Sequence, residues 1–131
     1  MFRSRSIDAK DRQLAIALGA GRIAIGAFAF AAPKTLLGQW GFPAAESGPT
    51  AEVLARLVGI RDIALGAATL AVLDDRESLA GIAALGAGVD VGDTVGSAMS
   101  AGQGLGKVAG GTAAVALPAA VAGAWLANRL R

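Results

Sequence analysis

The sequence contains no cysteine, no histidine and no tyrosine. Without cysteine the chain forms no disulfide, so the sequence gives no indication of its redox compartment. Cysteine and histidine are the usual ligands of zinc and of haem iron, so sites of that kind are excluded. Nucleophiles activated by histidine are excluded as well. Catalysis would have to rest on carboxylates alone, and we therefore expect no enzyme, no cofactor and no metal site.

Aromatic residues are also scarce, at 5%, whereas glycine contributes 19 residues and hydrophobic residues make up 54%. The mean hydropathy of +0.56 is high for a soluble domain. A chain so rich in small apolar residues packs by close approach of backbones, as helices do in lipid. The net charge is only +2, and the basic residues gather near the two ends. We expect a lipid bilayer as the main partner and no nucleic acid.

Four apolar runs follow one another within a single domain, 1–131, and each is close to the ~20 residues that cross a bilayer. They predict helices at about 13–32, 53–73, 78–99 and 107–128. None carries the wide polar stripe of a helix on a soluble core. We therefore predict an all-α fold, a bundle of four transmembrane helices. Trp40, in the Pro- and Gly-rich connection after the first run, is expected at the bilayer interface.

The distribution of lysine and arginine predicts the orientation. With four crossings, both termini and the turn at 74–77 share one side. The basic residues on that side are Arg3, Arg5, Lys10, Arg12, Arg76, Arg129 and Arg131. The opposite side carries Lys34 and Lys107, with Arg56 just inside the second helix. Since cytoplasmic segments carry the excess of Lys and Arg, we expect both termini to be cytoplasmic, in the bacterial inner (plasma) membrane.

Charged residues inside the apolar runs are the main functional candidates. They are Arg22, Arg56, Arg61, Asp62, Asp90 and Asp93. Each costs about 2.5–3.5 kcal/mol at the centre of a membrane helix on insertion scales. Three are positive and three are negative, which indicates an intramembrane network of mutual neutralisation.

Depth predicts the partners in this network. At a rise of about 1.5 Å per residue, Arg61 and Asp90 lie at the same depth in antiparallel helices, and Arg22 lies within reach of Asp62. We therefore predict the pairs Arg61–Asp90 and Arg22–Asp62. The planar guanidinium suits them because it bonds a carboxylate bidentately and stays charged.

The network has two possible roles. Buried Arg–Asp pairs can fix helix register and partner choice, which favours a non-enzymatic subunit, assembly factor or oligomer-forming module. Alternatively, Asp90 and Asp93 line a water-filled path in a small ion- or proton-coupled transporter or channel. A path would leave at least one aspartate without an arginine. Asp93 is the first candidate, because its nearest predicted partner, Arg56, can extend to the surface instead.

Glycines recur at helical spacing in the second half. They are Gly88, Gly92 and Gly96 in the third run and Gly106 and Gly110 at the start of the fourth. Small residues four apart let helices approach closely. They predict packing of the third and fourth helices in one subunit, or an interface in a homo-oligomer or a larger membrane complex.

The first two runs share a short pattern. The segment "GRIAIGAFAFA" of the first run is similar to "RDIALGAATLA" of the second. An internal duplication and a coincidence of composition both account for it. The stretch "RLVGIRDIALG", with "GRIAIGAFAFAAP" before it, resembles uncharacterised small four-helix bacterial membrane proteins. The resemblance covers the first half of the chain, implies the fold and implies no activity.

Overall fold

The computed structural model describes residues 6–131, and all of its regular elements are helical. The elements are α1 (Ala9–Ala31), α2 (Pro33–Gln39), η1 (Ala44–Glu46), α3 (Pro49–Ala71), α4 (Arg76–Ser100), η2 (Ala101–Gln103) and α5 (Gly106–Leu130). The predicted all-α class is thus confirmed. Arg3 and Arg5, counted in the charge bias, lie outside the described residues.

The four long helices coincide with the four apolar runs, but α1 and α3 begin four residues earlier than predicted. Helices start at capping signals and not at the first apolar residue. Asp8 caps α1 by accepting a hydrogen bond from the Lys10 backbone at 3.2 Å, and Pro49 opens α3. Asp75 caps α4 in the same way, and hydrogen bonds from Ser78 hold the pKa of Asp75 below its ordinary value.

Three of these helices are long and apolar enough to cross a membrane: α1, α4 continued by η2, and α5. This finding indicates a membrane protein. Helix α3 is also 23 residues long but carries Arg56, Arg61 and Asp62 in its apolar part. The sequence did not anticipate α2, which begins at Pro33 immediately after α1.

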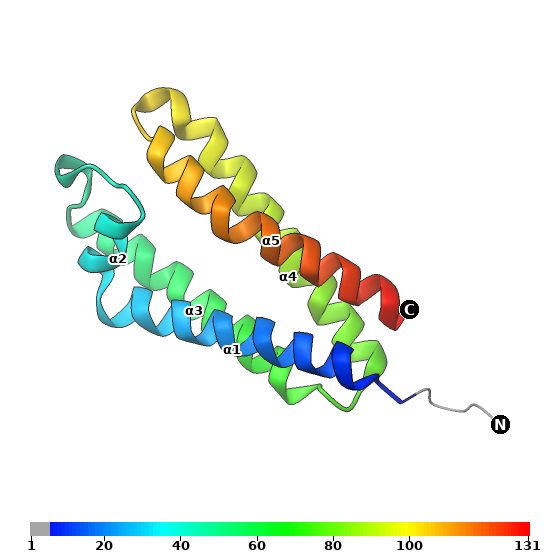
Figure 1. Ribbon diagram of the computed structural model, residues 1–131. Helices are drawn as coiled ribbons and strands as arrows, with labels where there is room; N and C mark the ends of the chain where they lie inside the picture. Colours follow the sequence, from blue (N-terminus) through cyan, green and yellow to red (C-terminus); the bar gives the residue numbers. More distant parts are fainter. Residues whose placement is uncertain (1–5) are drawn as a thin grey trace.

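The helices form two antiparallel pairs, α1 with α3 and α4 with α5 (Figure 1). Contacts are dense within each pair and sparse between pairs. Figure 1 shows the pairs close together where α1 begins and α5 ends, and further apart towards α2 and η2. The molecule is therefore a pair of hairpins joined at one end.

Glycines bring α1 and α3 into backbone contact. A Cβ atom on Gly26 would lie 2.5 Å from the Gly59 carbonyl oxygen, and one on Gly59 would lie 2.6 Å from that of Gly26. Gly19 and Gly66 face each other in the same reciprocal way. The two halves of the short repeat thus occupy equivalent positions across this antiparallel pair, 40 residues apart in the chain. The repeat is a packing motif.

The hydrophobic core lies at the end of the molecule where α1 begins and α5 ends, which we call the closed end. Its buried members come from α1, α4 and α5, and the two largest fully buried side chains are Leu79 and Leu126. Ion pairs reinforce this end. Arg129 donates to buried Asp11 at 2.9 Å, and Arg12 bonds Asp74 in the turn before α4. These ion pairs hold the start of α1 against the end of α5 and against the turn before α4.

We predict that Gly26→Ala lowers the free energy of unfolding by about 1–3 kcal/mol, because the added methyl group overpacks the α1–α3 contact. Thermal unfolding in detergent measures the change. Gly21→Ala is the matched control on the same helix, where an added Cβ has no neighbouring atom within 4 Å. It should leave stability unchanged or raised, since alanine favours a helix. Equal effects of both substitutions would contradict the packing role of Gly26.

Candidate functional site

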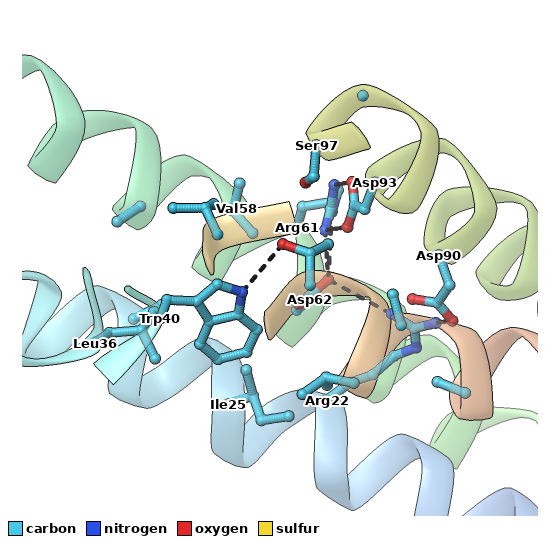
Figure 2. Close-up of a pocket in the computed structure, with 18 of the residues that line it drawn as sticks. Arg22, Ile25, Leu36, Trp40, Val58, Arg61, Asp62, Asp90, Asp93 and Ser97 are labelled. Atoms are coloured by element: carbon cyan, nitrogen blue, oxygen red, sulfur yellow. Dashed lines mark hydrogen bonds and ion pairs between the residues drawn. The ribbon is translucent and has the colours of Figure 1, made fainter. Parts of the chain in front are cut away.

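A cavity of about 560 Å³ separates the two helix pairs where they diverge. Its walls are mostly apolar and include Ile25, Leu36 and Val58 (Figure 2). Charged side chains of α1, α3 and α4 lie on one side, and Leu36 of α2 and Trp40, which directly follows α2, lie on another. Several lining residues are well exposed, for example Leu54 at 57%, so the cavity is a cleft open to its surroundings.

Trp40 connects α2 to α5 across the cavity. Its indole Nε1 donates to the Thr112 hydroxyl at 3.1 Å. A Cβ on Gly111 would lie 3.3 Å from the Trp40 carbonyl oxygen, so the two segments are in close contact. The chain then reverses at Gly41, whose φ of 88° favours glycine. We expected Trp40 at the bilayer interface, and the structure places it in the cavity wall.

Arg22 joins α1 to α4. Its Nη2 donates to Asp90 Oδ2 at 2.5 Å and to the Gly86 carbonyl oxygen at 3.1 Å, and its Nη1 lies 3.5 Å from Asp62 Oδ1. The side chains of Arg22 and Asp90 are only 13% and 7% exposed. Gly86 leaves the space for this approach, because a Cβ there would lie 3.1 Å from Arg22 Nη2.

Arg61 joins α3 to α4. Its Nη1 and Nη2 donate to the two carboxylate oxygens of Asp93 at 2.9 and 2.8 Å, in a bidentate pair. Its Nε and Nη2 also donate to Asp62 Oδ1, at 3.3 and 3.1 Å. Asp62 therefore lies between the two arginines, hydrogen-bonded to Arg61 and ion-paired with Arg22 (Figure 2).

These contacts correct part of the predicted pairing. Arg22 lies close to Asp62 as predicted, but the predicted Arg61–Asp90 pair is wrong. Depth alone could not separate Asp90 from Asp93, which lie one turn apart on α4. The choice follows from the gap above Gly86, which admits Arg22 to the deeper aspartate and leaves Asp93 to Arg61.

Arg56 does not join the network, contrary to expectation. It donates to the Phe30 carbonyl oxygen at 3.3 Å, approaches Glu52 at 3.9 Å and is 43% exposed. It lies five positions before Arg61, so the two side chains point about 140° apart around the helix. The predicted balance of three against three therefore becomes two arginines, Arg22 and Arg61, against three aspartates.

The glycines singled out in the second half do not pack the helices of this chain together. A Cβ on any of the following would meet no atom within 4 Å: Gly88, Gly92, Gly96 and Gly110. One on Gly106 would only approach the Ala101 carbonyl oxygen at 4.0 Å. In the α4–α5 pair the close approach is instead made by Gly123, 3.0 Å from the Ala83 carbonyl oxygen. Four-residue spacing did not reveal which helix face is buried.

A comparison with protein-family models identifies the family of the chain. Residues 19–126 match the family model described as Domain of unknown function (DUF4267). The chain belongs to this family. The match includes the short repeat, the charged network and the cavity, and it confirms the predicted resemblance to an uncharacterised family. No curated protein and no solved structure matches the chain.

We predict that double-mutant cycles will follow the observed pairs. Arg22→Gln and Asp90→Asn should each be destabilising, by up to about 3–5 kcal/mol, since each leaves a buried charge without its partner. Combined, they should show a coupling of about 1–3 kcal/mol in thermal unfolding. Arg61→Gln with Asp90→Asn is the comparison pair. These two residues do not contact each other but share a network through Asp62 and Arg22, so their coupling should be clearly smaller than that of Arg22 with Asp90. Strong coupling only in the second cycle would contradict the observed pairing.

Proposed function

We propose that the protein is a small polytopic membrane protein without enzymatic activity, in which an intramembrane Arg/Asp network holds two helix pairs in one arrangement. It would serve as a subunit, an assembly factor or an oligomer-forming module. The observation that supports this role is that Arg22 and Arg61 both bond across the divide between the pairs, to Asp90 and Asp93 on α4.

The geometry of the ion pairs favours a structural role over a path for ions. We call this role a lock, because the ion pairs would hold the two helix pairs in one arrangement. Contacts between the pairs are few apart from the closed end, so the ion pairs supply most of the specific connection at mid-length. Asp93, the residue that a path would leave unpaired, accepts a bidentate bond from Arg61. Ionic pairs of this kind specify a register even when their net contribution to stability is small.

The outer surface fits a lipid environment. Large apolar side chains are exposed along every long helix, including Phe30, Leu57, Met99 and Val121, with Met99 79% exposed. An exposed apolar surface of this extent is typical of contact with lipid or protein partners. We propose that all four long helices cross the bilayer. The exposed glycines of α4 then face outward, and contact with a second copy stays a prediction that native mass spectrometry in mild detergent can check.

We further propose that both termini are cytoplasmic. The start of α1, the turn before α4 and the end of α5 lie at one end of the molecule (Figure 1), and the basic residues concentrate there. A chain without cysteine suits single-cysteine labelling. Gln103→Cys should react with an impermeant maleimide on intact cells, and Asn128→Cys only after permeabilisation. The reverse pattern, or labelling of both on intact cells, would overturn this topology.

A small transporter or channel is the second candidate, because Asp90 and Asp93 both line the open cavity. Proteoliposomes containing a pH-sensitive dye separate the two proposals. If the network is a lock, an imposed pH gradient should decay at the rate of empty liposomes, for the wild type and for Asp93→Asn alike. Proton flux in the wild type that disappears in Asp93→Asn, with Asp74→Asn unaffected, would reject the lock in favour of the transporter.

A further inference from the structure

We propose that the cavity between the helix pairs is a binding site for an amphiphile with a cationic amine head and an apolar body. The head would lie against the Asp62–Asp90–Asp93 side of the charged network, and the body against the apolar walls. This inference goes beyond the proposed structural role, since a lock requires neither a cavity nor unbalanced charge.

The charges that line the cavity do not balance. Within residues 6–131, two arginines and three aspartates meet at the cavity, leaving one negative charge in excess. An uncompensated charge away from water is unfavourable, so a cationic partner there gains more than a neutral one. One positive charge bound at this point would therefore balance the network.

Two carboxylate oxygens of the network have no hydrogen-bond donor among the described residues. No described residue donates a hydrogen bond to Asp90 Oδ1 or to Asp62 Oδ2. Among the described residues no side-chain nitrogen or oxygen is both fully buried and without a partner, so both atoms keep some accessible surface, and Asp62 and Asp90 both line the cavity. The Asp90 side chain is nevertheless 93% buried by its own fold, with 7% exposed. An ammonium group has three donors and can use such acceptors.

The size and the walls of the cavity suit an amphiphile. A volume of about 560 Å³ lies within the range of ~300–1,000 Å³ typical of pockets for drug-sized ligands. Leu36, Trp40 and Val58 provide apolar and aromatic walls beside the charges (Figure 2). The open sides near Leu54 let a longer apolar chain extend into the surrounding lipid. A bare proton would neutralise the charge but would leave this apolar space unexplained.

Other ligand classes fit less well. Among residues 6–131 no three carboxylates are placed to hold a metal ion, and Asp62, Asp90 and Asp93 each face an arginine. An anionic head would meet the excess negative charge. An organic amine with an apolar body would both balance the excess negative charge and contact the apolar walls.

The test uses the full-length chain in a non-ionic maltoside, with Trp125→Phe as background so that Trp40 is the remaining tryptophan. Trp40 fluorescence is titrated with dodecylamine, dodecan-1-ol and dodecanoate, which share a chain and differ in head charge. We expect dodecylamine to bind at least about tenfold more tightly than the alcohol, and dodecanoate to bind most weakly. Equal affinities for the three probes would overturn the proposal.

A charge variant tests the cause of this preference. Asp62→Asn removes the excess charge and keeps the bonds Arg22–Asp90 and Arg61–Asp93 that join the pairs. It should abolish the preference for the amine and leave binding of the alcohol unchanged. Asp74→Asn makes the same chemical change at an exposed site at the opposite end and should alter neither. Unchanged selectivity in Asp62→Asn would refute the electrostatic argument.

A substitution that fills part of the cavity tests whether the ligand binds there. Gly96 lines the cavity, whereas Gly88 on the same helix does not, and an added Cβ meets no atom within 4 Å at either position. Gly96→Leu should weaken dodecylamine binding at least about tenfold, with Gly88→Leu unchanged. Weaker binding of dodecylamine in both variants, or in neither, would show that it binds outside the cavity.

The same assay distinguishes two sources of the ligand. Dodecylamine partitions into the bilayer, and adamantan-1-amine carries the same head on a compact, water-soluble body. Tight binding of dodecylamine alone would identify a ligand from the membrane, and binding of both would admit one from the aqueous phase. Failure of both amines would reject the site without affecting the proposed lock, which the double-mutant cycles test.

Discussion

The bonds from Arg22 and Arg61 to α4 are the interaction on which the arrangement of this molecule depends. Each helix pair is held internally by close backbone contact, but the pairs touch each other mainly at one end. Further along, two arginines of one pair reach two aspartates of the other. In a low-dielectric environment such charges are costly alone and much less costly when paired. The ion pairs therefore hold the two helix pairs together at mid-length, and the helix pairs diverge beyond them.

The cavity is a consequence of the same constraint. Glycine contacts keep α1 and α3 too close to leave space between them. Space can only open between the pairs, and it opens beyond the ion pairs, where α2 and Trp40 cover part of it. Asp62 serves both arginines at the inner limit of this space. The element that joins the pairs is thus also the polar wall of the cleft.

Membership of the DUF4267 family covers residues 19–126 and so includes every element of this site. The family description assigns no activity, so we infer the function from the residues of this chain. Paired charges support a structural role, and the open, mostly apolar cavity beside them supports a ligand. The two are compatible, since a cleft held at a fixed width by ion pairs is a preorganised binding site.

The sequence by itself determined the helical class, the four long helices and the six charged residues worth attention, because hydrophobic runs and the cost of buried charge are local properties. It also determined that Arg22 and Asp62 lie near each other. Only the tertiary structure decided that Arg61 bonds Asp93, that Arg56 turns outward and that the glycines of α4 remain exposed. These outcomes depend on which face each helix presents to its neighbour. In a chain whose small residues surround every helix, periodicity does not specify that face.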